Sequence, residues 1–261
     1  MMKEIPICHR LIKATHRKLL SDLPQGRGGS KLPGEYKTSQ NWIGGATIES
    51  ARFVPSPPLE AQAAMDQLEN YINRPDPFNP PALIEAALAH YQFETIHPFA
   101  DGNGRVGRIL IPLIFLARGL TATPVFYPSA SIENRRSEYV DRLFAVSTAG
   151  TWTDWLRFFL QICTDTCANS AKVINDLIDL QARYRDFAVS EFRSNNVLVL
   201  IDFLFHSPVV TTPIVKDLLS VTHRAARQSI AKLEQIGVLE KMDGSSKPEY
   251  FVAHGILRAS S

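Results

Sequence analysis

Apolar side chains recur every three or four residues over most of the first 190 positions, which is the spacing of amphipathic helices. The pattern predicts helices over residues 5–20, 59–73 and about 80–96. It also predicts a helix from about 103 to 119 and two or three more helices over 132–192. We therefore expect the first part of the chain to be mainly α-helical.

Two early segments break this helical period. Residues 22–35 contain four Gly and two Pro, which predicts a loop. Residues 36–57 place Trp42 and Phe53 on either side of a Gly-Gly pair, which predicts a short β-hairpin. Asn79 precedes a proline, and we expect it to cap the helix that follows.

The pattern changes near residue 193. It predicts a helix over 196–205, a second from Thr212 to about Ser220, and a third from Thr222 to Gly237. Two strands are expected within 238–252. This order is that of a winged helix-turn-helix. We therefore expect two domains, residues 1–192 and residues 193–261.

Composition adds little to this picture. The chain is 45% hydrophobic and 21% charged with a net charge of +2, which is ordinary for a globular protein. Its three cysteines, Cys8, Cys163 and Cys167, do not suggest a disulfide framework. The N-terminus has no apolar run behind its charges, and residues 109–117 are far short of the roughly 20 that a membrane span needs. We expect a cytoplasmic protein.

The most informative stretch is His-Pro-Phe-Ala-Asp-Gly-Asn-Gly-Arg-Val-Gly-Arg at 97–108. Glycines let successive backbone N–H groups point into one concavity, and a helix N-terminus adds unpaired donors and the positive end of its dipole. Gly102, Asn103 and Gly104 lead directly into the predicted helix, so they form a candidate phosphate site. Arg105 and Arg108 would share a helix face at the same end, where an anionic ligand would offset their unfavourable position.

Two further side chains in this loop suggest chemistry. Asp101 offers a hard oxygen ligand for Mg²⁺, which proteins hold with one or two carboxylates and substrate phosphates. His97 is suited to take a proton from an incoming hydroxyl near neutral pH. Each feature alone is more often a turn or a cap. Their occurrence together within twelve residues favours a functional site.

Residues 97–108 match the Fic-family signature H-P-F-x-[DE]-G-N-G-R-x-x-R at every fixed position. Residues 38–45 and 52–55 resemble the flap of that family, and 86–96 resemble the helix before its motif. The resemblance covers about residues 5–190. It implies a helical Fic domain with a β-hairpin flap at about 38–54, followed here by the small winged-helix domain.

The resemblance also implies an activity, protein AMP transfer from ATP to a Ser, Thr or Tyr hydroxyl with release of pyrophosphate. His97 would be the general base, and Asp101 would bind Mg²⁺ between the α- and β-phosphates. Arg105 and Arg108 would hold the β- and γ-phosphates. The other nucleotide-binding residues that the resemblance implies are Pro98, Phe99, Gly102, Asn103 and Gly104, with Gln92 and Asn134 resting on a looser match.

The partners that follow are ATP, a target protein docked on the flap by strand pairing, and the chain itself as a target of self-modification. A homodimer is a further expectation by analogy. Kinase relatives of the Doc type carry Lys or Arg where Gly104 stands, which favours AMP transfer here. Two alternatives stay open: a nucleotide-sensing DNA-binding regulator, and a Fic enzyme with another phosphate-containing donor.

Many Fic enzymes are inhibited by a helix carrying [ST]-x-x-x-E-[GN], whose Glu pairs with the second motif arginine. Residues 1–37 contain no such match, and we expect the chain to lack its own inhibitory helix or to receive one from a separate protein. The only formal match, SASIEN at 129–134, is interpreted as a coincidence.

The last predicted helix of the C-terminal module bears a basic face. Arg224, Arg227 and Gln228 would lie together, as a helix that reads a DNA groove requires. DNA binding through residues 211–250 and a protein-docking role remain alternatives, because Glu234, Glu240 and other acidic residues offset the basic charge.

Overall fold

The structure is a computed structural model that describes residues 6–21, 32–75, 80–242, 244 and 248–260. Its contacts divide the chain into two compact units, Met1–Cys167 and Ala168–Ser261. The division falls inside the long helix α7, Trp152–Phe192, and the domain boundary expected at 192–193 lies at the end of that helix.

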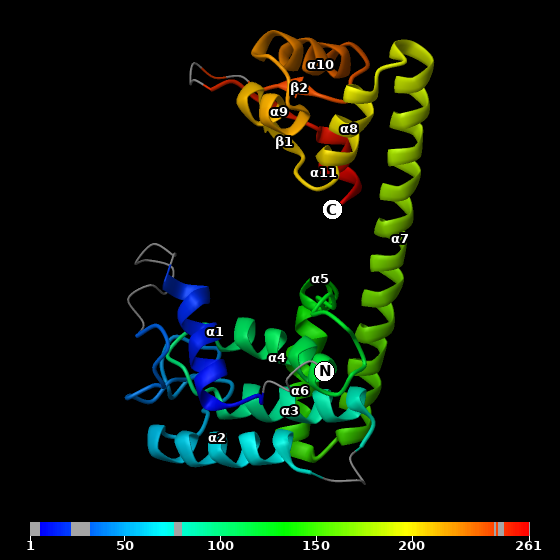
Figure 1. Ribbon diagram of the computed structural model, residues 1–261. Coiled ribbons are helices and arrows are strands. Elements are labelled where there is room, and N and C mark those ends of the chain that lie inside the picture. Colours follow the sequence, from blue (N-terminus) through cyan, green and yellow to red (C-terminus); the bar gives the residue numbers. More distant parts are fainter. Residues whose placement is uncertain (1–5, 22–31, 76–79, 243, 245–247, 261) are drawn as a thin grey trace. The chain divides into compact units, whose positions relative to one another are not determined.

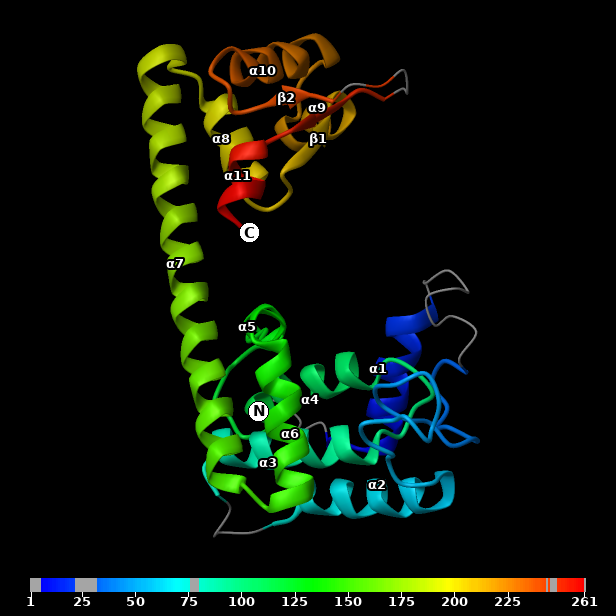
Figure 2. The same ribbon diagram turned by 180° about the vertical axis from the view of Figure 1, so that it is seen from behind.

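The first unit is built from helices (Figures 1 and 2). They are α1 His9–Ser21, α2 Pro58–Asn73, α3 Ala82–Ile96, α4 Asn103–Ala117, α5 Ser129–Asn134 and α6 Arg136–Ala149, together with the first part of α7. Helix α3 packs between α2 and α4, so it is buried on most sides. This explains why its apolar residues are not confined to one stripe.

Most of the helices expected from the sequence are confirmed. The first begins at His9 rather than residue 5, with its N-terminal amide donating to Glu69 Oε2 at 2.6 Å. The expected cap at Asn79 lies outside the described residues, and α3 instead begins after Pro81 without a side-chain cap. The hairpin at 36–57 is reduced to a single antiparallel bridge between Ile43 and Phe53.

Buried charges join α3 to the C-terminal ends of α2 and α4. Glu85 has no solvent exposure, and its carboxylate accepts hydrogen bonds from Arg118 at 2.6 and 2.7 Å. Arg74 lies 3.5 Å from the same carboxylate. Because a buried charge is costly without a partner, these contacts hold the three helices together.

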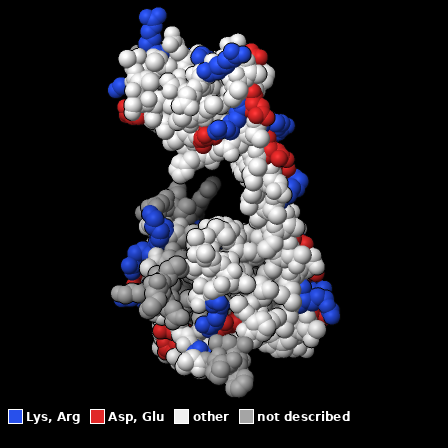
Figure 3. Space-filling view, turned by 45° about the vertical axis from the view of Figure 1, so that its right-hand side comes forward, with Lys and Arg blue, Asp and Glu red and all other residues white. Residues whose placement is uncertain are grey.

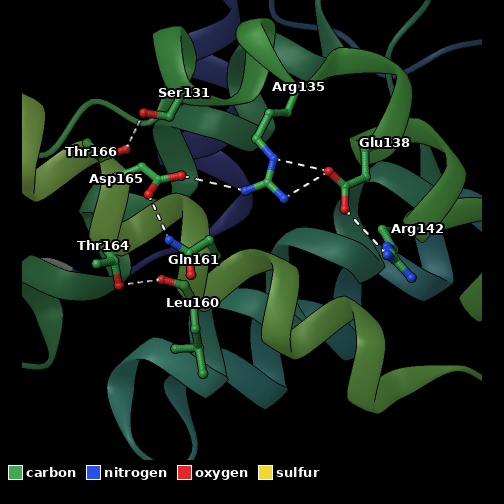
Figure 4. A network of polar contacts seen from close by, with 9 residues as sticks. All are labelled: Ser131, Arg135, Glu138, Arg142, Leu160, Gln161, Thr164, Asp165 and Thr166. Atoms are coloured by element: carbon green, nitrogen blue, oxygen red, sulfur yellow. Dashed lines mark hydrogen bonds and ion pairs between the residues drawn. The ribbon is translucent and has the colours of Figure 1, made fainter.

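A polar network holds α5 and α6 against α7 (Figure 4). Arg135 pairs with Glu138 at 2.8 Å and with Asp165 on α7 at 3.5 Å. Thr166 Oγ1 donates to Ser131 Oγ at 2.9 Å. These contacts fix the position of α5 and α6, which form one wall of the cavity described below.

The second unit combines the rest of α7 with α8 Asn195–Leu204, α9 Thr212–Leu219, α10 His223–Gln235 and α11 His254–Ala259. A three-stranded antiparallel sheet has the order β1-β3-β2, from β1 Val209–Thr211, β2 Glu240–Lys241 and β3 Tyr250–Val252. Val209 pairs with Val252, and Glu240 pairs with the same residue from the other side. Thr222 caps α10 as expected, by accepting from the Ala225 amide at 3.3 Å.

Two elements of this unit were not expected from the sequence. Strand β1 is only three residues long, and α11 is only six, so neither spans enough positions to show a period. Both contribute to the core of the unit, through Val210 and Ile256. None of the helices in the described part of the chain combines the length and the apolar composition that a membrane span requires.

Candidate active site

The loop that follows α3 turns the chain sharply into α4. His97 ends α3 with φ of 51°, and Gly102 precedes α4 with φ of 80°. The left-handed value is ordinary for glycine but unusual for histidine, so surrounding contacts must hold His97 in place. The loop therefore depends on side chains that fasten its backbone.

The side chain of Asn103 forms two hydrogen bonds with the backbone of Phe99, at the other end of the loop. Its Oδ1 accepts from the Phe99 amide and its Nδ2 donates to the Phe99 carbonyl, both at 2.8 Å. Asn41, at the base of the flap, donates to the carbonyls of Phe99 at 2.9 Å and His97 at 3.2 Å. Lys37 Nζ donates to Asn41 Oδ1 at 2.7 Å. Flap and loop are thus one hydrogen-bonded unit.

Helix α1 supports the loop from another direction through His16. The Gly34 amide donates to His16 Nδ1 at 2.8 Å, so the ring proton is on Nε2. That nitrogen donates to the Asp101 carbonyl at 2.9 Å. The ring also stacks on Phe99 with centroids 3.8 Å apart. Asp101 is therefore held at its backbone while its side chain is half-exposed.

A cavity of about 260 Å³ opens beside the loop, between the flap, α3, α4 and α6. Three motif residues line it: His97, Gly104 and Arg108. The remaining wall is largely apolar, and its members include Ile43, Phe53, Ile132, Tyr139, Val140, Leu143 and Phe144. An apolar pocket with a few convergent polar groups is the usual form of a small-molecule site.

The flap closes over one side of this cavity through Arg52. Its Nη2 pairs with Asp141 Oδ1 on α6 at 2.6 Å, and its guanidinium lies 5.0 Å from the ring centre of Phe144. This contact ties the loop between Ile43 and Phe53 to the helical wall. The cavity is consequently bounded on the flap side by an ion pair.

The imidazole of His97 is held in one neutral tautomer. Its Nδ1 lies 3.2 Å from the Glu94 carbonyl, which can only accept, so Nδ1 carries the proton. The lone pair of Nε2 is then available for a proton. Burial lowers the pKa of His97 to about 4, with the charge of Lys37 adding to the effect. The imidazole is thus neutral over the physiological pH range.

The first amides of α4 lie outside the hydrogen-bond ladder of the helix. Val106 is the first residue whose amide bonds back into the helix, to Gly102, so the amides of Asn103, Gly104 and Arg105 precede the helical ladder. The Gly102 amide is not available in the same way, because it donates to Asp101 Oδ1 at 2.6 Å.

The two motif arginines differ in their contacts. Arg108 lines the cavity and donates through Nε to Ser129 Oγ on α5 at 3.2 Å. Arg105 lies 3.7 Å from Asp101 Oδ1 instead. Pro98 and Phe99 are buried in the loop, where they support its shape.

Eight of the eleven sequence-predicted residues do not line the cavity: the motif residues Pro98, Phe99, Asp101, Gly102, Asn103 and Arg105, and, outside the motif, Gln92 and Asn134. Gln92 is exposed on α3 and lines a separate hollow with Tyr71 and Trp152. Asn134 is exposed at the end of α5, next to Glu133, which does line the cavity. Their roles as nucleotide contacts remain predictions.

Sequence reasoning missed several residues that shape the site. Asn41 and Lys37 lie in or beside the flap segment but have no motif chemistry of their own, and His16 gave no signal. Glu94 lines the cavity while being buried on α3, where a helical pattern would have placed an apolar residue. A charged residue in a stripe of apolar positions is the signal that could have identified it.

Comparison with known proteins agrees with this geometry. Residues 6–115 match the model of the Fic/DOC family. This segment is similar to a Fic/DOC family domain. Two curated proteins that it resembles are both named "Protein adenylyltransferase Fic": one from Aedes aegypti, 31% identical, and one from Culex quinquefasciatus, 30% identical, each over 151 residues. Each alignment covers 58% of this chain, which spans about a quarter (26%) of the length of these relatives.

The fold is shared over a longer stretch. A crystal structure of a Fic family protein from Desulfovibrio desulfuricans G20 matches 94% of this chain with a TM-score of 0.54, at 18% identity and over 68% of that chain. The segment similar to Fic/DOC domains thus has a fold with a solved counterpart. At this identity the likeness concerns the fold alone.

Proposed function

We propose that the chain is a protein adenylyltransferase, which moves AMP from ATP onto a hydroxyl of a protein and releases pyrophosphate. The names of the relatives support this reaction, and the site geometry supports it independently. The observation that carries the proposal is the tautomer of His97, because a proton on Nδ1 presents a bare Nε2 on a residue that lines the cavity.

In the proposed reaction, His97 Nε2 takes the proton of the target hydroxyl. The hydroxyl oxygen then attacks the α-phosphorus of ATP, and the bond from that phosphorus to the bridging oxygen of pyrophosphate breaks. Arg108 and the amides at the start of α4 stabilise the charge on the phosphates. Catalysis rests on positioning and charge stabilisation.

The carboxylate oxygens of Asp101 are suitable ligands for a magnesium ion. Oδ1 is engaged by the Gly102 amide and lies near Arg105, whereas the half-exposed carboxylate keeps a second oxygen for a ligand. No group of three or more metal-binding side chains occurs in the part of the chain that the structure describes, which suits an ion held mainly by substrate phosphates. When bound, Mg²⁺ would supply charge neutralisation on the α- and β-phosphates.

The flap is the proposed docking site for the target protein. Ile43 and Phe53 form one antiparallel bridge, and a target segment could add to this edge as a further strand. Such a strand would bring a hydroxyl toward His97, which lines the same cavity as both flap residues.

The test is the intact mass of the protein after incubation with ATP and Mg²⁺. A gain of one or more AMP groups on the chain or on an added target supports the proposal, and His97→Ala should abolish that gain while still binding ATP. A phosphate-sized gain would indicate kinase chemistry, and a mass gain only with another phosphate-containing donor would indicate a different Fic transfer. Either result would contradict AMP transfer.

We also propose a second function for the second unit, in which α8, α9, α10 and the strand pair β2–β3 act as a winged helix-turn-helix that binds DNA. On α10 the side chains of His223, Arg224 and Gln228 are exposed. Arg227 is occupied, because it pairs with Glu234 at 2.6 Å and lies over Phe251. The exposed set would face a DNA groove.

The second proposal rests on the exposed side chains of α10 alone. On the face shown in Figure 3, basic and acidic side chains are interspersed rather than separated. A gel shift with wild type and Arg224→Ala at two salt concentrations tests it, since phosphate contacts weaken with salt. Arg227→Ala is a control for stability. If neither protein changes the mobility of labelled DNA at either salt concentration, DNA binding is excluded.

A further inference from the structure

Glu94 is a buried carboxyl inside a pocket built for an anion. It lies on α3, it lines the cavity with Gly104 and Arg108, and its Oε1 is buried without a hydrogen-bond partner among the described residues. The mechanism above gives it no task beyond its backbone carbonyl, which orients His97. An unsatisfied buried carboxyl oxygen is costly, so its position needs an explanation.

Gly107 of α4 leaves the space that this carboxyl occupies, and Gly104 lies beside it. A Cβ added at Gly107 would lie 2.2 Å from Glu94 Oε1. A Cβ added at Gly104 would lie 3.3 Å from Arg108 Nη1 and 3.9 and 4.0 Å from the two Glu94 oxygens. The carboxyl and the guanidinium therefore both lie within about 4 Å of the same point on α4.

We propose that Glu94 is a proton-linked residue of the nucleotide site, which is neutral when a triphosphate occupies Arg108 and competes with the triphosphate for Arg108 when ionised. This inference rests on the proposed function, because it assumes a polyphosphate beside Arg108. A carboxylate there would repel the phosphates and attract the guanidinium. A protonated carboxyl does neither, and its O–H can donate to a phosphate oxygen.

The protonation state of Glu94 is poised for this exchange. Burial raises its pKa to about 7, although the charge of Arg108 acts in the opposite direction. A bound triphosphate would add negative charge and so raise the pKa further. Nucleotide binding would then take up a proton near neutral pH.

The pKa values of the histidines and the tyrosine around Glu94 are held far from neutral pH. Burial lowers the pKa values of His90 and His97 to about 4, and raises that of Tyr139 well above its usual value. His90 is fixed as a neutral ring, with Nδ1 donating to the Gly107 carbonyl and Nε2 accepting from the Tyr139 hydroxyl, both at 2.9 Å. Burial lowers the pKa of Lys37, which acts on His97, to about 8, and comparison with Glu94→Gln cancels this titration because both proteins share it. The remaining charged groups that line the cavity are Arg52, Arg108, Glu133 and Arg136.

Three of these charged groups already have partners. Arg52 pairs with Asp141 at 2.6 Å, and Glu133 pairs with Arg136 at 3.1 Å. Arg108 is bound only to the neutral Ser129 hydroxyl among the contacts of the described chain. It is therefore the cation for which an ionised Glu94 and a phosphate would compete.

The test measures binding of Mg²⁺-loaded α,β-methylene ATP, which cannot donate AMP, from pH 6 to pH 8. From pH 6 to pH 8 we expect the Kd of wild type to rise about tenfold more than the Kd of Glu94→Gln. The reason is that Glu94 ionises near pH 7, and only its neutral form allows the triphosphate to bind Arg108. Glu94→Gln is the matched control, since it keeps the shape and fixes the neutral state. It also cancels the titration of the nucleotide itself.

Calorimetry in two buffers of different ionisation enthalpy should show greater proton uptake by wild type than by Glu94→Gln. Parallel pH profiles and equal proton uptake would overturn the inference while leaving the nucleotide site intact. Failure of both proteins to bind the analogue would instead overturn the proposed function and this inference with it. If Glu94→Gln does not fold, a carbon-13 NMR titration of wild type decides, because the pKa of Glu94 must rise on binding and an unchanged value contradicts the inference.

Discussion

One contact and its burial together set the state of the His97 imidazole. The Glu94 carbonyl fixes its tautomer, and burial holds the pKa near 4. A base is active in its neutral form, so lowering its pKa moves the acid limb of the rate to lower pH.

We therefore expect the rate of AMP transfer at saturating nucleotide to change little between about pH 7 and pH 5.5. An imidazole with the ordinary pKa of 6.5 would lose half its base form by pH 6.5. Thermal melts at each pH control for unfolding, and saturating nucleotide removes effects on binding. An acid limb centred near pH 6.5 would show that His97 is not desolvated as described.

Gly107 and Gly104 provide a matched pair of substitutions. Gly107→Ala places a Cβ 2.2 Å from Glu94 Oε1 and 3.2 Å from the Phe93 ring, whereas Gly104→Ala meets the flexible end of Arg108 at 3.3 Å. We expect Gly107→Ala to lower the free energy of unfolding by about 1–3 kcal/mol through overpacking. Gly104→Ala should keep its stability and weaken nucleotide binding. Urea unfolding and nucleotide titration of both variants check this, and equal stability losses would contradict it.

At the scale of elements, most helices of the first unit could be predicted because they span several turns with recurring apolar residues, whereas α5 has only six residues. The loop at 97–102 could be assigned to a phosphate site because its glycines and arginines have known chemistry. The residues that hold that loop in place could not be predicted. His16 and Asn41 act through contacts across 85 and 58 residues, and no local pattern reveals such pairs.

Helix α5 is the element that most needs testing, because it holds the formal match to an inhibitory motif. Its Ser129 contacts Arg108, yet its Glu133 pairs with Arg136 at 3.1 Å rather than with Arg108. We expect Glu133→Gly to change self-AMPylation with labelled ATP by less than about twofold, as for an exposed ion pair. Arg136→Gln is the control that breaks the same pair. Strong activation by Glu133→Gly alone would show that α5 inhibits the enzyme.

At the scale of the whole molecule, the chain has two separate hydrophobic clusters. Trp155 and Phe159 of α7 belong to the first, and Leu180 and Ala188 of the same helix belong to the second. The change of pattern near residue 193 predicted a second module, and the sequence could not show that one helix contributes to both cores. Strand β1 could not be predicted either, because its three residues are too few to show a period.

Separate cores predict separate losses of stability. Leu200 has no exposure in the second unit, so Leu200→Ala should cost about 2–5 kcal/mol there. Hydrogen exchange should quicken in α8, α9 and α10, while nucleotide binding by the first unit persists. The matched variant Leu110→Ala, also buried but on α4, should quicken exchange around the active site. Loss of nucleotide binding in both variants would argue against separate cores.

The central claim is the identity of the transferred group, and positional labelling of ATP tests it most directly. The protein is incubated with Mg²⁺, candidate targets and ATP labelled at either the α- or the γ-phosphate, beside His97→Ala. The account predicts that protein becomes labelled from the α-position only, that labelled pyrophosphate appears from the γ-position, and that His97→Ala yields neither. Label from the γ-phosphate on protein, or α-label unaffected by His97→Ala, would contradict it.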